Sequence, residues 1–232
     1  MRSKFFTLAT SLLLASLAVN KAKAQDEEPP VPPAGKQGYI RFWNMLPPAN
    51  GKFDLRKAGG SGGTNLFAGT PYRYASYIGL AVGKYRLVVY RSGDQVTPLK
   101  SFDVDLKPET YFTVLMSPQA GAMNIELLSD TVDPKATTAT LTVRNYFPGL
   151  TVAVSSADKQ IVDALAYGQS YKAEGLARAN MPLTLRTRLS NGTPAESGAE
   201  ADFKMIKRAT LLIIPDSYGR FRPRVTIDGK NL

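Results

Sequence analysis

Three arginines near the end of the chain are spaced two residues apart, which would place them together on one surface of a strand. Arg220, Arg222 and Arg224 alternate with apolar residues, so on a β-strand they project from one face at a repeat of about 6.8 Å. Planar guanidinium groups suit bidentate contacts with carboxylates. Pro223 cannot donate to a strand ladder, which predicts an edge strand. Natural edge strands also carry charge and proline to prevent aggregation, so the row fits either role.

Four more residues complete the predicted binding site. Arg186 and Arg188 add positive charge in the same part of the chain, and Tyr72 and Tyr74 fall in a stretch that looks like a loop. Exposed tyrosines stack on sugar faces or anchor protein interfaces, although a tyrosine packed into a sandwich corner is the commoner arrangement. These seven residues predict a site for a polyanion or a protein partner.

Other candidate chemistry is poorly supported. The chain has no histidine and no cysteine, the residues that most acid–base, nucleophilic and transition-metal sites use. Asp103 and Asp105 share one face of a predicted strand, but their alternation with apolar residues is typical of a half-buried strand. The glycine-rich segment 59–63 lacks the Lys-Ser/Thr of a phosphate-binding loop. We therefore predict a protein that is not an enzyme and holds neither cofactor nor metal.

The N-terminal residues predict export. Residues 1–24 have the basic start, short apolar run and Ala-Lys-Ala end of a signal peptide, and residues 25–37 form a proline-rich tether. We expect a periplasmic protein, or alternatively a secreted or cell-surface one, with no transmembrane segment in the mature chain. Cleavage removes four of 29 basic residues and leaves 25 against 19 acidic ones, a net charge of +6. This charge favours anionic partners, and export makes nucleic acid a poor candidate.

The remaining sequence repeats one pattern of short strands. Ile40–Pro47 aligns with Leu141–Pro148, and each segment is predicted as a strand that ends at an Asn, before a Pro that stops the strand ladder. Tyr111–Leu115 aligns with Thr210–Ile214. Strand patterns recur about every ten residues with turn residues between them. The prediction is an all-β protein with two tandem Ig-like β-sandwich domains of about seven strands, 38–131 and 137–232.

Short motifs also carry a family resemblance. Arg41–Asn44, Gly83–Tyr85, Tyr111–Leu115 and Val143–Asn145 resemble the F-type periplasmic accessory protein of alginate O-acetylation, over most of residues 38–228. The resemblance implies a non-catalytic adaptor that holds an acetyltransferase, another envelope protein or an acidic polysaccharide such as alginate. Similar motifs occur in exported Ig-like domains of unknown function, so an envelope or surface scaffold or an adhesion module is the alternative.

Overall fold

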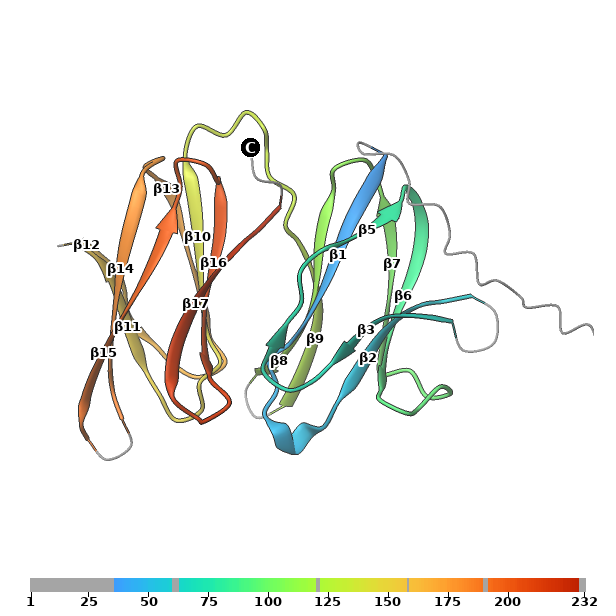
Figure 1. Cartoon of the computed structure of the whole chain (residues 1–232), viewed down its shortest axis with the longest axis horizontal. Helices are drawn as coiled ribbons and strands as arrows, with labels where there is room; N and C mark the ends of the chain where they lie inside the picture. Colours follow the sequence, from blue (N-terminus) through green and yellow to red (C-terminus); the bar gives the residue numbers. More distant parts are fainter. Residues whose placement is uncertain (1–35, 60–62, 120–121, 158, 190–191, 230–232) are drawn as a thin grey trace, which may run out of the picture. The chain divides into compact units, whose positions relative to one another are not determined.

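The computed structural model describes residues 36–59, 63–119, 122–157, 159–189 and 192–229. These residues form seventeen β-strands and one short 3-10 helix, η1 (Pro48–Asn50), with no α-helix among them. The predicted all-β sandwich fold is confirmed (Figure 1). The predicted signal peptide and nearly all of the tether lie outside the described residues. Within the described part, no helix is long and apolar enough to cross a bilayer.

The first nine strands build two sheets, which we name sheets A and B. Sheet A has the order β4-β1-β8-β9, with β5 also paired to β1, and sheet B has the order β3-β2-β6-β7. Their bounds are β1 Gln37–Asn44, β2 Phe53–Lys57, β3 Thr64–Gly69, β4 Arg73–Tyr74, β5 Ile78–Ala81, β6 Gly83–Arg91, β7 Lys100–Leu106, β8 Tyr111–Gln119 and β9 Ala122–Ser129.

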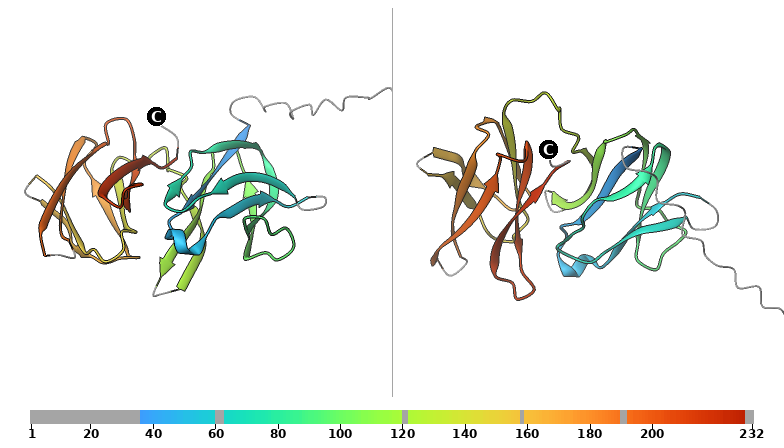
Figure 2. Two further views of the ribbon diagram at one scale, coloured as in Figure 1. Left: turned by 60° about the horizontal axis from the view of Figure 1, so that its bottom comes forward. Right: turned by 45° about the horizontal axis from the view of Figure 1, so that its top comes forward.

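The last eight strands build sheets C and D. Sheet C has the order β13-β10-β16-β17, and sheet D has the order β12-β11-β14-β15. Their bounds are β10 Ala139–Asn145, β11 Val152–Ser156, β12 Lys159–Leu165, β13 Ser170–Leu176, β14 Asn180–Arg188, β15 Pro194–Asp202, β16 Arg208–Pro215 and β17 Phe221–Ile227. The views of Figure 2 show the sheets of β1–β9 and those of β10–β17 as separate sets. We refer to them as the first copy and the second copy.

The two copies repeat one topology. In each copy the first strand pairs in parallel with the last strand but one: β1 with β8, and β10 with β16. The last strand of each copy, β9 or β17, forms the edge of a sheet. Arg41 lies opposite Thr113, and Thr142 lies opposite Thr210. Because Arg41 and Thr142 are equivalent, Thr113 corresponds to Thr210. The sequence alignment of Tyr111 with Thr210 is therefore wrong by two residues, a shift that leaves every side chain on its original face.

A buried asparagine ends the first strand of each copy. Asn44 and Asn145 are both fully buried. Each accepts the backbone N–H two residues further on, at 3.2 and 3.0 Å. Their amide groups donate to the carbonyl at the end of the third strand, Gly69 at 3.2 Å and Leu165 at 2.8 Å. The prediction that each segment is a strand ending at an Asn is confirmed, and the bonds explain why the residue is Asn.

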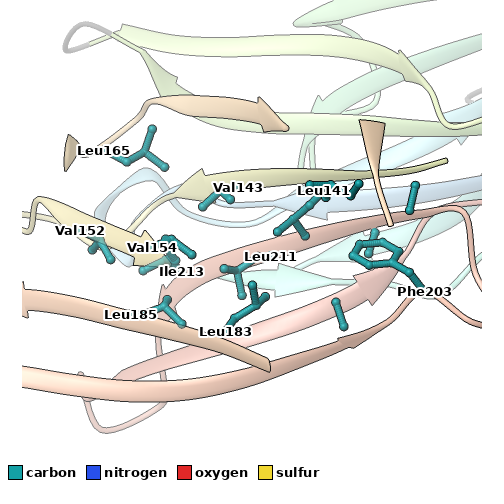
Figure 3. Packing of buried hydrophobic residues seen from close by; sticks show 14 of the residues in the cluster. Leu141, Val143, Val152, Val154, Leu165, Leu183, Leu185, Phe203, Leu211 and Ile213 are labelled. Atoms are coloured by element: carbon teal, nitrogen blue, oxygen red, sulfur yellow. The ribbon is translucent and has the colours of Figure 1, made fainter. Parts of the chain in front are cut away.

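Each copy has its own apolar core because alternate strand residues face inward. The first core includes Phe42, Leu55 and Val114. The second includes Leu141, Leu185 and Leu211, packed as shown in Figure 3. Buried Val104 and Leu106 alternate with exposed residues on β7, which confirms the half-buried strand predicted around Asp103 and Asp105.

A third apolar cluster lies on the outer faces of sheets A and C. It contains Trp43, Met45 and Leu115 from the first copy, and Tyr146, Leu212 and Ile214 from the second. Alternation along the strand puts Trp43 on the face opposite Phe42 and predicts that it is partly exposed, but Trp43 is 1% exposed. The prediction is wrong because both faces of sheet A are covered.

Candidate functional site

A cleft of about 820 Å³ is lined by strand β4 and its preceding turn and by the hairpin of β16 and β17. We name it the basic cleft. Its lining residues are Pro48, Pro71, Tyr72, Arg73, Tyr74, Ile214, Pro215, Asp216, Ser217, Tyr218, Gly219, Arg220, Arg222 and Arg224. Five of the seven predicted binding residues, two tyrosines and three arginines about 150 positions later in the chain, therefore line one cleft.

The edge strand β17 positions two of the arginines. Arg222 and Arg224 lie opposite Ile214 and Leu212 of β16 and are exposed, while Phe221 packs against the second core from the other face. The predicted edge position is confirmed, since β17 pairs with β16 at the end of sheet C. Arg220 departs from the prediction slightly, because it lies in the turn just before the strand.

Asp216 fixes the hairpin turn and two guanidinium groups. Its Oδ1 accepts the backbone N–H groups of Tyr218 and Arg220, at 2.8 and 2.9 Å. Its Oδ2 lies 2.8 Å from Nε of Arg220 and 3.4 Å from Nε of Arg222. Partial burial raises the pKa of Asp216, but the hydrogen bonds from Arg220 and Tyr218 and the charge of Arg220 outweigh it and hold the pKa below its usual value. The carboxylate is therefore charged at neutral pH.

Tyrosines form the opposite wall. Tyr74 pairs with Trp43 across β4 and β1 and is 39% exposed. Tyr72 has a φ of +50°, which is unusual for a bulky residue and places strain beside the cleft. Burial, and to a lesser extent Tyr167, raise the pKa of Tyr72 to about 12, so its hydroxyl stays neutral and available for hydrogen bonding.

The cleft has a strong positive charge. Four arginines and one carboxylate give its lining a formal charge of +3. Among the described residues, only Arg220 and Arg222 of this lining form ion pairs, both with Asp216. In the part of the chain that the structure describes, Arg73 and Arg224 have no carboxylate within ion-pair distance. Unneutralised guanidinium groups beside exposed rings are suited to a ligand that carries both negative charge and flat apolar faces.

Arg186 and Arg188 lie away from the cleft. Both are exposed on β14 of sheet D, whereas Arg220, Arg222 and Arg224 flank or belong to β17 of sheet C. Arg186 pairs with Glu196 across β14 and β15, with Nε 3.0 Å from the carboxylate. Asp103 is likewise occupied, since both of its oxygens accept hydrogen bonds from Arg86. The structure thus separates Arg186 and Arg188 from the other five predicted binding residues.

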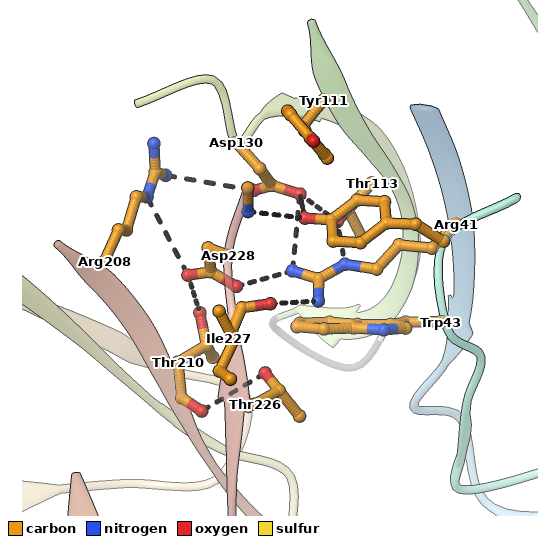
Figure 4. A network of polar contacts seen from close by, with 12 residues as sticks. Arg41, Trp43, Tyr111, Thr113, Asp130, Arg208, Thr210, Thr226, Ile227 and Asp228 are labelled. Carbon is orange, nitrogen blue, oxygen red and sulfur yellow. Dashed lines mark hydrogen bonds and ion pairs between the residues drawn. The ribbon is translucent and has the colours of Figure 1, made fainter. Parts of the chain in front are cut away.

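A buried polar network lies between the strands that carry the two walls (Figure 4). Arg41 is 3% exposed, and all three of its nitrogens donate. Nε donates to Thr113 at 2.6 Å, Nη1 to the carbonyl of Ile227 at 3.0 Å, and Nη2 to Asp130 at 3.3 Å and Asp228 at 2.5 Å. The network thereby ties β1, which holds β4, to the end of β17.

Other groups complete the neutralisation of the two carboxylates. Arg208 lies 3.9 Å from Asp130 and 3.8 Å from Asp228, so two arginines face two buried aspartates. The guanidinium of Arg41 also lies over Trp43, 3.9 Å from the ring centroid, and over Tyr77 at 4.3 Å. Tyr77 donates to Asp130 at 2.8 Å. We expect this network to hold the walls of the cleft in place.

Sequence reasoning missed this network. Arg41, Asp130 and Asp228 are separated by 89 residues or more, and no local pattern joins them. One signal was present: with the corrected alignment, Thr113–Asp130 and Thr210–Asp228 are equivalent pairs, and in each the threonine donates to the aspartate.

Comparisons with known proteins assign no family to the chain. No protein-family model and no curated protein matches the chain, so the resemblance to the alginate O-acetylation accessory family gains no support there. Among solved structures, the CBMbc module of family CBM26 from Eubacterium rectale Amy13K, in complex with maltoheptaose, is 12% identical. It covers 82% of this chain and 96% of its own, with a TM-score of 0.27.

Two proteins from Bacteroides species are similar at the same level. A putative cell adhesion protein from Bacteroides uniformis is 12% identical, with 83% of this chain and 99% of that chain covered and a TM-score of 0.22. A DUF3823 family protein from Bacteroides ovatus is 8% identical, with 72% and 99% covered and a TM-score of 0.23. Likeness at these TM-scores assigns neither a family nor a ligand to this chain.

Proposed function

We propose that this chain is an exported, non-catalytic envelope or surface module that binds an anionic polymer in the basic cleft. The observation that carries the proposal is the convergence of Tyr72 and Tyr74 with Arg220, Arg222 and Arg224 on one hollow. The chemistry and spacing of these five residues predict a binding role from the sequence alone. All five line one cleft whose formal charge is +3. This arrangement favours a single binding site over a set of unrelated exposed residues.

The ligand class that fits best is an acidic polysaccharide. Arginine forks recognise carboxylates, and exposed tyrosine rings stack on the faces of sugars. The signal-peptide pattern of residues 1–24 supports export to a compartment where such polymers occur. The lack of histidine and cysteine supports a role in binding rather than in catalysis.

A narrower form of the proposal is an adaptor in polysaccharide O-acetylation. It rests on the family resemblance of the sequence motifs and would use the same cleft to hold the acidic polymer while a partner acetyltransferase acts. An adaptor of this kind is expected to bind alginate and to retain an acetyltransferase from envelope extracts. The broader proposal stands without that second partner.

The competing explanation is that the arginines only protect an edge strand. A pair of matched double variants separates the two. Arg222→Ser with Arg224→Ser removes two exposed charges spaced two residues apart on β17, and Arg186→Ser with Arg188→Ser removes two with the same spacing on β14.

We expect the Arg222→Ser/Arg224→Ser variant, the β17 pair, to lose most of its affinity for polygalacturonate and much of the salt dependence of binding. The Arg186→Ser/Arg188→Ser variant, the β14 pair, should bind like the wild type. Affinity is measured by titration at several ionic strengths, with neutral mannan as the control polymer. Equal affinity of the β17 pair and the wild type would contradict the proposal, and faster aggregation of that pair would then support edge protection.

A further inference from the structure

Asp216 engages two arginines of the basic cleft through the same atom of each. Its Oδ2 faces Nε of Arg220 and Nε of Arg222, at 2.8 and 3.4 Å. The Asp216 side chain is 13% exposed, whereas those of Arg220 and Arg222 are 58% and 52% exposed. Two backbone N–H groups hold the other carboxylate oxygen. A well-fixed carboxylate thus presents two solvent-facing guanidinium groups in a set orientation.

This arrangement leaves the terminal forks of both arginines open. A guanidinium group has five N–H donors. The hydrogen bond from Arg220 to Asp216 uses Nε, and the ion pair of Arg222 with the same carboxylate is also made through Nε. Among the described residues, no hydrogen bond occupies the Nη atoms of Arg220 or Arg222. The Arg220 guanidinium is also held 4.8 Å from the ring centroid of Tyr218. Each free Nη1–Nη2 edge matches the two oxygens of one carboxylate.

The charge of Asp216 has a second consequence. A fixed negative charge beside the forks repels ligands whose anionic groups are closely packed, because several of those groups would then lie near the carboxylate. A ligand with single, well-separated carboxylates is repelled less. Specificity often depends on such a repulsive element as well as on attraction.

We propose that Asp216 is a specificity-determining residue, which positions Arg220 and Arg222 for single carboxylates and disfavours densely charged polyanions. The ligand class is then a polysaccharide with about one carboxylate per sugar, rather than a sulfated or phosphorylated polymer. The inference rests on the proposed function of the cleft. Asp216 acts through the arginines and the local field, and it need not touch the ligand.

The test compares two probes, polygalacturonate and dextran sulfate, with the mature chain at equal ionic strength. Asp216→Asn removes the charge but keeps an oxygen that accepts the backbone N–H groups of the turn. Asp163→Asn removes one exposed negative charge on β12 and serves as the matched control. We expect wild-type protein and the control to prefer polygalacturonate. Asp216→Asn should shift the affinity ratio toward dextran sulfate by about fivefold or more.

A second variant covers the case in which Asp216→Asn does not fold, as judged by thermal unfolding. Arg222→Lys keeps the charge and removes the fork, and we expect it also to shift the ratio toward dextran sulfate. If the folded variants changed affinity for both polymers equally, or showed no change, the role of Asp216 would be overturned while the proposed function stood. If folded wild-type protein bound neither polymer, the proposed function itself would fail.

Discussion

Strands β9 and β17 hold equivalent positions in the two copies and differ in what they display. Both form the edge of a sheet beside the strand that pairs in parallel with the first strand. Glu126 of β9 lies opposite Leu115 in the same way that Arg224 of β17 lies opposite Leu212. Ile125 occupies the place of Pro223. An edge strand of this topology therefore has no general need for an arginine row, which favours a ligand as the reason for the row on β17.

The comparison also separates what the copies share from what has changed. Both keep the buried Asn at the end of the first strand and a Thr–Asp pair near the end of the last. Arg41 of the first copy, by contrast, is replaced by Thr142 in the second. The shared Asn builds each sandwich, and Arg41, which the second copy lacks, joins the copies by donating to both of the shared aspartates.

The largest expected effect comes from Arg41→Leu. This change leaves Asp130 and Asp228 buried with only the more distant Arg208, so we expect a loss of about 3–5 kcal/mol in the free energy of unfolding. The equivalent change in the second copy, Thr142→Val, should cost less than about 1 kcal/mol. Denaturant unfolding of the two variants measures this contrast.

The pH dependence of Arg41→Leu adds a check. Burial raises the pKa of Asp228, although Arg41 opposes this shift. Without Arg41 the pKa rises further, and the protonated carboxyl needs no cation. The cost of the substitution should therefore be greatest at neutral pH and shrink as the pH falls. Equal losses in the free energy of unfolding for Arg41→Leu and Thr142→Val at pH 7 would show that the network contributes no more to stability than an ordinary strand position.

A smaller effect is expected at the shared asparagines. Asn44→Ala and Asn145→Ala each leave buried backbone groups without partners, at a cost of about 1–3 kcal/mol. Asn145 donates to two carbonyls, at 2.9 and 2.8 Å, and Asn44 to one at 3.2 Å. The Asn145 variant should therefore lose more stability, by chemical denaturation. The reverse order would argue against equivalent roles in the two copies.

The smallest effect concerns the tyrosine wall. Tyr72→Asn removes the ring but suits the positive φ of this position, since Asn tolerates left-handed backbone. We expect unchanged or slightly higher thermal stability and an affinity for polygalacturonate that is lower by about threefold or more. Tyr171→Asn, at a 43% exposed position on β13, is the control and should bind normally. A loss of affinity in both variants would indicate a nonspecific contribution of exposed rings.

Much of the scaffold was predictable because strand signals are local. The strand ending at Asn44 and the edge position of β17 both follow from a few adjacent residues. The burial of Trp43 was not predictable, since alternation along a strand does not reveal that a second sheet covers its other face. The two-residue error in aligning Tyr111 with Thr210 has a related cause, because a shift of two preserves the pattern of inward and outward residues.

The candidate site was predictable in part for the same reason. The arginine spacing around Pro223 is visible in the sequence, but its proximity to Tyr72 depends on the packing of distant strands. The network around Arg41 depends entirely on the packing of distant strands. The division into domains 38–131 and 137–232 stays a prediction. Separate apolar cores support it, whereas the shared cluster around Trp43 and Leu212 predicts that each half alone is less stable.

Hydrogen–deuterium exchange of the mature chain with and without polygalacturonate tests the central claim most directly. We predict that the polymer slows exchange in peptides that cover residues 70–75 and 215–225, and that it leaves β9 and β14 unchanged. Neutral mannan should protect none of them. Protection of β14 around Arg186 and Arg188 instead, or equal protection of β9 and β17, would contradict the assignment of the basic cleft as the binding site.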